Sequence, residues 1–270
     1  MSHSATSLPP ARVAGLLLCG LLMPSIVTAQ SSGLTDGTFI SVNGGFQPSE
    51  QTLKESWTKA VYGETASFDT NRKVGSGGLF EVSGGVRVWR NVSAAVGVSV
   101  LNTSRAATIN GTVPSPLYYN SARSATHSLA SDLEHRQLGV HLMAVYVYPI
   151  TETIDVAFFG GPSIFKVSQD LVSGETLGAE ASPFDAISIN GVTRTTSQKT
   201  GIGGNVGVDV TYMLTDMIGV GGLIRYTRAS VSPDAYTTLD GEAVSPDPAS
   251  IAVGGLQVGG GLRLRLPSFF

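Results

Sequence analysis

The chain has 270 residues, of which 42% are hydrophobic and 14% charged, with 33 Gly, one Cys and a formal net charge of −3. An average chain has roughly 25% charged residues and roughly 7% Gly, so charge is nearly halved here and Gly nearly doubled. This composition disfavours a cytosolic α/β enzyme, which needs more charge on its surface. The body of the chain also lacks the apolar runs of about 20 residues that transmembrane helices require. We therefore expect a β protein whose outer surface faces something other than water.

Residues 1–29 are expected to be a signal peptide rather than part of the fold. Arg12 is their only charged residue, an apolar segment runs from Val13 to Ile26, and the segment ends on Ala29. A basic start, an apolar run and a small-residue site are typical of a secretory signal, and an N-terminal membrane helix is the less favoured alternative. Cleavage leaves residues 30–270 as one domain and removes Cys19, so neither a disulfide nor a thiolate metal site is expected.

The rest of the chain alternates apolar and polar residues with a period of two, which is typical of half-buried strands. In one segment, for example, Val96, Val98 and Val100 alternate with Gly97 and Ser99. Eight such segments are present, at about 38–47, 79–89, 92–101, 129–148, 154–167, 202–213, 218–229 and 251–266.

The connections between these segments differ in length in a regular way. Those after the second, fourth and sixth segments are short, at 90–91, 149–153 and 214–217. The other four are long and polar, at 48–78, 102–128, 168–201 and 230–250. Short periplasmic turns alternating with long extracellular loops are typical of outer-membrane barrels, in which the sheet must close because lipid offers no hydrogen-bond partners. The sequence therefore predicts an eight-stranded antiparallel up-and-down transmembrane β-barrel with both termini periplasmic.

Two of the long connections contain features of their own. In the first, 56–62 and 66–74 alternate around Gly63-Glu64 and favour an extended hairpin, whereas Thr52–Glu55 matches a helix capping box. In the second, the run from Pro114 to Tyr119 is apolar enough to fold onto the barrel mouth or to contact a partner.

The charged residues of the strands fall on the polar face, which a barrel turns toward its lumen. A basic residue on the lipid face costs roughly 2–4 kcal/mol at the bilayer midplane, and an isolated charge in the lumen is also costly. We therefore expect a lumen network of paired charges that forms a structural plug, with a charged constriction or gate as the alternative. Its predicted members, with His141 as further polar filling, are Glu81, Arg87, Asp155, Asp209, Arg225, Arg263 and Arg265.

The last segment has Leu262, Leu264 and Leu266 at alternate positions, on one face of the predicted strand, and the sequence ends on Phe270. This pattern resembles the C-terminal signal that the barrel-assembly machinery reads in its clients. With the signal peptide and the eight segments, the chain resembles the family of small bacterial outer-membrane β-barrels that includes the OmpA N-terminal domain, OmpX, OmpW and the opacity proteins. The resemblance implies an outer-membrane location in a Gram-negative type of envelope. It also implies contact with outer-membrane lipid and lipopolysaccharide, and no nucleic-acid partner.

Three functions remain open from the sequence. A structural or surface-interaction barrel with a filled lumen and an extracellular ligand at its loops is favoured, and a narrow porin-like channel for small solutes is the alternative. A lipid-directed hydrolase is the remote third, since His127-Ser128 or the group Asp132, Glu134 and His135 would have to supply a base and its partners. Adjacent residues of a strand point to opposite faces, which disfavours the first pair. We expect no catalytic site, cofactor or metal site.

Overall fold

The computed structural model describes residues 37–231, 236–237, 243–247 and 251–266. The predicted signal peptide and Phe270 lie outside the described residues. Within those residues, no helix is long and apolar enough to span a membrane. The regular elements are β1 (Thr38–Gln47), β2 (Gln51–Val61), β3 (Glu64–Val74), β4 (Gly77–Trp89), β5 (Val92–Pro114), β6 (Ala122–Pro149), β7 (Ile154–Leu177), β8 (Ile189–Met213), β9 (Ile218–Val231), β10 (Tyr236–Thr237), β11 (Ala243–Asp247) and β12 (Ile251–Leu266).

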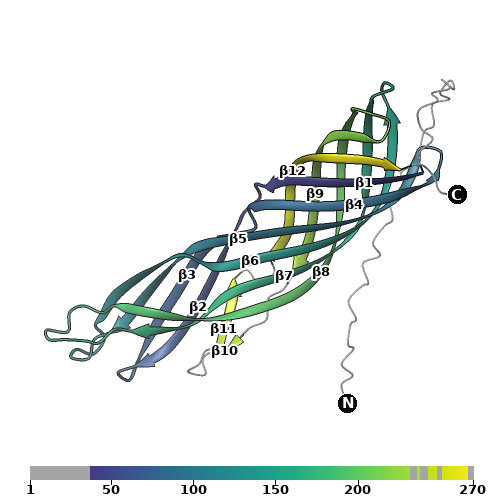
Figure 1. Ribbon diagram of the computed structural model, residues 1–270. Coiled ribbons are helices and arrows are strands. Elements are labelled where there is room, and N and C mark those ends of the chain that lie inside the picture. The colour runs from purple at the N-terminus through teal and green to yellow at the C-terminus, as the bar shows by residue number, and fades with distance from the viewer. Residues whose placement is uncertain (1–36, 232–235, 238–242, 248–250, 267–270) are drawn as a thin grey trace, which may run out of the picture. The chain divides into compact units, whose positions relative to one another are not determined.

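All strands belong to one antiparallel sheet that closes on itself. The sheet order runs β10-β11-β2-β3-β5-β4-β1-β12-β9-β8-β7-β6, and β6 pairs back onto β5. Strands β1, β4, β5, β6, β7, β8, β9 and β12 therefore form a closed ring, which Figure 1 shows as the part at upper right. The prediction of an all-β antiparallel barrel is confirmed.

The described residues form twelve strands rather than the eight that the alternation pattern identifies, because β2, β3, β10 and β11 lie in the predicted loops 48–78 and 230–250. The ring strands also extend into the predicted loops. β5 continues to Pro114 and β6 begins at Ala122, so only 115–121 connects them instead of 102–128. β7 and β8 likewise leave only 178–188 of the predicted loop 168–201. In these extensions the outward residues, such as Thr108 and Asn110, are polar, so the apolar alternation fades although Ile109 stays buried.

The first long connection is an extended hairpin of β2 and β3. Its turn places Tyr62 and Gly63 at positive φ, 53° and 76°, the conformation that matches the twist of two-residue hairpins. The helix capping box interpretation of Thr52–Glu55 is wrong, since these residues lie in β2 and pair with β3. Leu53 and Glu55 are buried on the inner face, whereas Lys54 between them is exposed.

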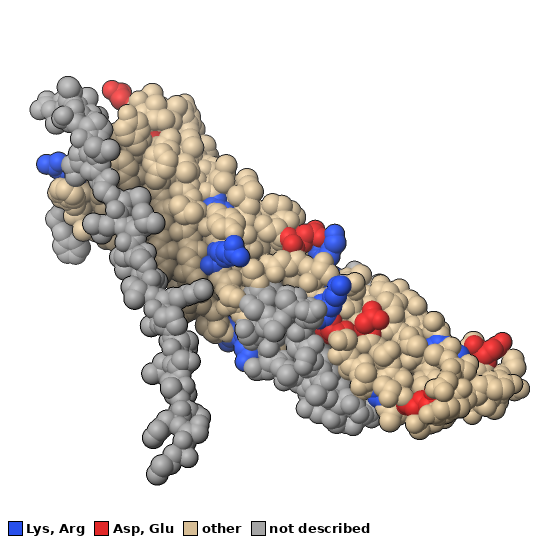
Figure 2. All heavy atoms as spheres, turned by 180° about the vertical axis from the view of Figure 1, so that it is seen from behind, with Lys and Arg blue, Asp and Glu red and all other residues tan. Residues whose placement is uncertain are grey.

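The outer wall of the ring is apolar. Figure 2 shows the molecule from behind. Few charged side chains lie over its upper left part, and more lie in its middle and at lower right. Outward positions carry large hydrophobic residues that are about half exposed, among them Phe80, Val96, Leu142, Phe158, Val206, Ile224 and Leu262. In water such a surface would favour association, whereas in a bilayer it matches the surrounding hydrocarbon.

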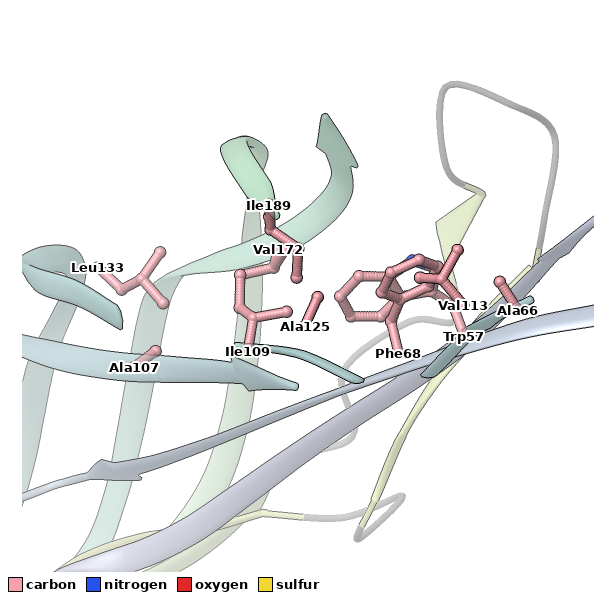
Figure 3. Close-up of a cluster of buried hydrophobic side chains, with 10 residues drawn as sticks. All are labelled: Trp57, Ala66, Phe68, Ala107, Ile109, Val113, Ala125, Leu133, Val172 and Ile189. Carbon is pink, nitrogen blue, oxygen red and sulfur yellow. The ribbon is translucent and has the colours of Figure 1, made fainter. Parts of the chain in front are cut away.

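Beyond the ring, β2, β3, β10 and β11 combine with residues 103–114, 122–134, 168–177 and 189–200 of β5–β8 into a region that we call the projecting sheet (Figure 1). It has its own apolar core, drawn in Figure 3. In it Trp57 stacks on Phe68 with ring centroids 5.6 Å apart. A Cβ at Gly111 would lie 2.8 Å from the Phe68 ring, so a glycine at this position makes room for the aromatic pair.

Replacing Phe68 by Ala should loosen the projecting sheet without opening the ring. The ring of Phe68 is 1% exposed, and loss of a buried Phe costs about 3–5 kcal/mol. We expect rapid proteolytic cleavage within β2 and β3 while the heat-dependent gel migration of the barrel persists. Ser67→Ala, at the exposed neighbouring position on β3, is the matched control. Equal resistance of both variants to protease would contradict the role of this core.

Candidate functional site

The interior of the ring is crossed by a layer of buried polar side chains. Each ring strand contributes one residue to it, and none of these residues is more than 6% exposed. We call this set the lumen layer; its members are Gln47, Glu81, Ser99, His141, Ser163, Asn205, Arg225 and Gln257.

One half of the lumen layer is a hydrogen-bonded row from β1 to β4. Gln257 Nε2 donates to Gln47 Oε1 at 2.7 Å, and Arg225 Nε donates to Gln257 Oε1 at 2.7 Å. Arg225 Nη2 also lies 2.8 Å from Glu81 Oε2. The row thus joins four neighbouring strands, with one ion pair at its end.

The other half of the lumen layer centres on His141. Its Nε2 lies 2.9 Å from Ser99 Oγ and its Nδ1 lies 2.8 Å from Ser163 Oγ. Asn205 Nδ2 donates to the same Ser163 hydroxyl at 2.8 Å. Ser99 and Glu81 are register partners across β4 and β5, so the two halves lie side by side on these strands.

Apolar side chains cover the lumen layer on the side of the projecting sheet. Phe165 packs edge-on against His141 with ring centroids 5.5 Å apart. Val167, Ala229, Val231 and Val253 join it in one buried cluster. Apolar side chains thus narrow the interior on this side, where a cavity of about 30 Å³ lies between residues that include Gln137, Val167 and Val253. Within the lumen layer, Asn205 Oδ1 and Arg225 Nη1 are buried without a hydrogen-bond partner among the described residues.

On the side of the short turns the lumen holds more charge and a cavity. Arg263 donates to Asn43 Oδ1 at 2.6 Å and, through Nε, to Asp209 Oδ1 at 3.0 Å. Arg265 forms an ion pair with Asp155. These groups line a cavity of about 130 Å³, which is large enough for several water molecules.

The structure places every predicted member of the charge network on the inner face of the ring. Glu81, Arg225 and His141 lie in the lumen layer. The other two acids each face an arginine near the short turns, and Arg87 lines the cavity there. The sequence analysis selected lumen residues by their charge, so it did not identify the neutral members of the lumen layer. These members also lie at inward-facing positions of their strands: Gln47, Ser99, Ser163, Asn205 and Gln257.

The projecting sheet contains a buried ion pair that the sequence analysis did not identify. Arg72 Nη2 lies 3.4 Å from Glu55 Oε1, and Thr70 donates to the same carboxylate. Burial raises the pKa of Glu55, and the positive charge of Arg72 opposes this shift. The pair holds β2 and β3 in register from inside the projecting sheet.

Among the side chains that the structure describes, the residues considered for hydrolysis lie on different faces of β6. His127 lies on the same face of β6 as the buried residues Arg123 and Ala125, whereas Ser128 beside it is exposed. His135 is buried and its Nδ1 lies 3.3 Å from Gln169 Oε1, with Glu134 exposed on the opposite face. The side chain of Asp132 lies outside the described residues. No group of three or more His, Cys, Asp or Glu that could hold a metal ion occurs in the described part of the chain.

A closed antiparallel sheet with an apolar outer wall and a polar, filled interior has the features of a transmembrane β-barrel. No family model matches the chain, and no curated protein matches its sequence.

Similar solved structures are bacterial outer-membrane or surface proteins, the class that the sequence resembles. Neisserial surface protein A is 13% identical with a TM-score of 0.38, over 85% of this chain and 97% of that one. The outer membrane protease OmpT from Escherichia coli is 10% identical with a TM-score of 0.43, over 88% and 99%. The attachment invasion locus protein Ail of Yersinia pestis is 12% identical with a TM-score of 0.32, over 85% and 99%. These likenesses are distant, so the function proposed below depends on this chain's own residues.

Replacement of Arg225 alone by Met should destabilise the barrel by about 3–5 kcal/mol, because it leaves Glu81 charged and buried without its partner. The double variant Glu81→Gln, Arg225→Met removes both charges, and most of the loss should be recovered. Urea unfolding in lipid vesicles, followed by tryptophan fluorescence, measures both effects. A double variant as unstable as the single one would show that the ion pair itself is not the source of the loss.

Proposed function

We propose that this protein is an outer-membrane β-barrel with a sealed lumen and a structural or surface-interaction role. The observation that carries the proposal is the lumen layer, in which each ring strand contributes one buried polar residue to one of two hydrogen-bonded groups in the interior. A narrow porin-like channel would need an open path at this level, and apolar residues cover the layer on one side. The cavity of about 130 Å³ on the other side ends at the layer, since Glu81 belongs to both.

The apolar outer wall supports insertion into a bilayer. On β6 the outward residues from Leu138 to Tyr148 are apolar, which spans ten residue steps, or about 33 Å along the strand. At the usual strand tilt this corresponds to a band roughly 25 Å tall, the height of the apolar band of outer-membrane barrels. Trp89, Tyr148 and Tyr212 mark its edge at the short turns, as interfacial aromatic residues do.

In this placement the short turns face the periplasm and the projecting sheet faces outward from the cell. Thr38 pairs with both Val86 and Leu266 near the short turns, so the described ends of β1 and β12 lie on the periplasmic side. The proposal includes removal of residues 1–29 as a signal peptide and delivery to the barrel-assembly machinery through the C-terminal residues Leu262, Leu264, Leu266 and Phe270.

The end of the projecting sheet supports a role in contact with an extracellular ligand. Tyr62, Leu117, Tyr118 and Tyr119 are all more than half exposed, and exposed aromatic residues are enriched in binding interfaces. The segments that carry them are held together, because the backbone N–H of Asn120 donates to the Glu64 carboxylate at 3.0 Å. Tyrosine side chains have only two rotatable side-chain torsions, so such a surface loses little conformational entropy on binding.

The sealed lumen predicts that the refolded protein, residues 30–270, shows no discrete single-channel openings in planar bilayers. The buried side chains of the lumen layer block the interior in this proposal, so the conductance should match that of the bare bilayer. The variant Arg225→Ala, Gln257→Ala removes the middle of one hydrogen-bonded row and should produce openings. Reproducible openings of the unaltered protein would reject the sealed lumen and favour the channel.

The loop 178–188 should become more sensitive to protease in acid. Arg123 donates to Glu180 at 2.7 and 3.1 Å, and these hydrogen bonds hold the pKa of Glu180 below its ordinary value. A lowered carboxyl pKa means that the pair stabilises the loop above the ordinary value of about 4.3, and that the stabilisation is lost as the pH falls through the lowered value.

Pepsin cleavage within 178–188, measured relative to a control variant at each pH, should therefore accelerate through this range. Glu180→Gln should be cleaved faster at the upper end of the range and should lose the pH dependence. Asp185→Asn, in the same loop and exposed, is the matched control. An unchanged pH profile in Glu180→Gln would contradict the assignment.

A further inference from the structure

The outer wall of the ring contains a groove with no partner in the fold. It has a volume of about 720 Å³ and crosses β1, β4, β5, β6 and β7. Its floor consists of small outward residues that are neighbours in register: Ala94 pairs with Ala144, and Ala144 pairs with Gly160. With Gly84, Val96 and Leu142, which also line it, these residues define what we call the outer groove.

Two ridges of large side chains border this floor. On one side Val96 pairs with Leu142, and on the other Tyr146 pairs with Phe158. All four side chains are between 44% and 51% exposed. The groove therefore lies within the apolar band, where its occupant in a membrane must itself be apolar.

A second feature lies on the same two strands, nearer to the projecting sheet. Arg136 on β6 and Lys166 on β7 are both exposed on the outer face. Leu138 pairs with Lys166, and Arg136 pairs with Ser168, so the two bases are diagonal neighbours with their Cβ atoms roughly 7–8 Å apart. Neither base has an ion pair within the described residues. They stand just beyond Leu138 and Ile164, the last apolar residues of the band on these strands.

The spacing between the two features matches one lipid molecule. Arg136 and Ala144 are eight residues apart on β6, about 26 Å along the strand. At a tilt of 35–45° this gives a depth of roughly 20 Å. That depth covers a headgroup and half of a hydrocarbon core about 30 Å thick. The tilt also displaces Ala144 sideways around the barrel by roughly 15–18 Å from Arg136. A lipid with its headgroup at the bases therefore reaches the outer groove with an acyl chain that follows β6 along the outer wall.

We propose that the outer face of β6 and β7 binds one lipid of net negative charge with phosphate in its headgroup, lipid A, in the leaflet on the side of the projecting sheet. Its phosphate lies between Arg136 and Lys166, and one acyl chain occupies the outer groove. The inference rests on the membrane placement proposed above. It adds a specific site to the general contact of a barrel with lipid.

The charges on this face argue against a second copy of the chain as the occupant. A two-fold dimer presents the same surface on both partners. In a membrane the axis of such a dimer lies along the bilayer normal, so Arg136 and Lys166 would meet their own copies at the same height. Like charges brought together there would oppose association, whereas a phosphate between the two bases neutralises them.

The test uses vesicles of phosphatidylcholine that contain a minor share of diphosphorylated lipid A. The protein is refolded into them, extracted in mild detergent and examined by native mass spectrometry for retained lipid. The expected result is one retained lipid A per chain, in preference to phosphatidylcholine. In Arg136→Gln, Lys166→Gln the retained fraction should fall about tenfold or more, since each base near a membrane surface contributes on the order of a factor of five.

Ala144→Phe fills the outer groove and should lower retention while leaving both bases in place. Ala94→Leu fills the same groove from β5 and replaces it if the first variant does not reach the compact, heat-modifiable form. The matched controls are Arg228→Gln, an exposed base on β9, and Gly222→Leu, an outward position on β9 where an added Cβ meets no atom closer than 4.0 Å. Both controls should retain lipid A as the unaltered chain does.

Three results would overturn the proposal: no preference for lipid A in the unaltered chain, unchanged retention in the double variant, or equal loss in the Arg228→Gln control. Conductance of the same preparations keeps this test separate from the function proposed above. Discrete openings with intact lipid retention would reject the sealed lumen alone, whereas closed bilayers without retention would reject the lipid site alone.

Discussion

In a bilayer, every backbone N–H and C=O must find its partner within the protein, because each group left unpaired in hydrocarbon costs several kcal/mol. The pairing of β5 with β6 meets this requirement by turning the sheet into a ring. Once the ring is closed, each strand has one face toward the lumen and one toward lipid. A slip of one residue in any pairing would exchange the two faces of that strand. The lumen layer and the apolar outer wall are thus both consequences of closure in this register.

Glycine residues leave room inside the ring for the polar side chains beside them. A Cβ at Gly139 would lie 2.7 Å from Ser99 Oγ and 2.9 Å from His141 Nε2. A Cβ at Gly221 would lie 2.8–2.9 Å from the guanidinium of Arg263. Larger residues at these two positions would displace the network members beside them. Part of the excess glycine in the composition therefore reflects the narrow interior, where an absent side chain lets a neighbouring polar one reach its partner.

The sequence was sufficient to predict the ring because period-two alternation is strong wherever one face meets lipid. β1 and β12 have the predicted bounds, 38–47 and 251–266. Beyond the ring the pattern reverses, because the outward residues, such as Thr108 and Asn110, are polar while inward ones, such as Ile109, are apolar. The apolar stripe that faces lipid ends there, so the sequence predicts loops for the extensions of β5 and β8. The contacts of Gln47 with Gln257, and the alignment of Ala94, Ala144 and Gly160, depend on register between strands. No single segment of the sequence specifies that register.

The pairing of the first ring strand with the last has a kinetic consequence. Thr38 on β1 lies opposite Leu266 on β12, so the pairing brings together residues from the two ends of the described chain. Contacts at such separation form slowly, and this one forms only after β12 has been synthesised. Until then, β1 and β9 each present an edge whose backbone groups lack their final partner, the kind of edge that recruits other chains. Protection of these edges while the ring is still open is thus a requirement that the topology imposes on the protein's biogenesis.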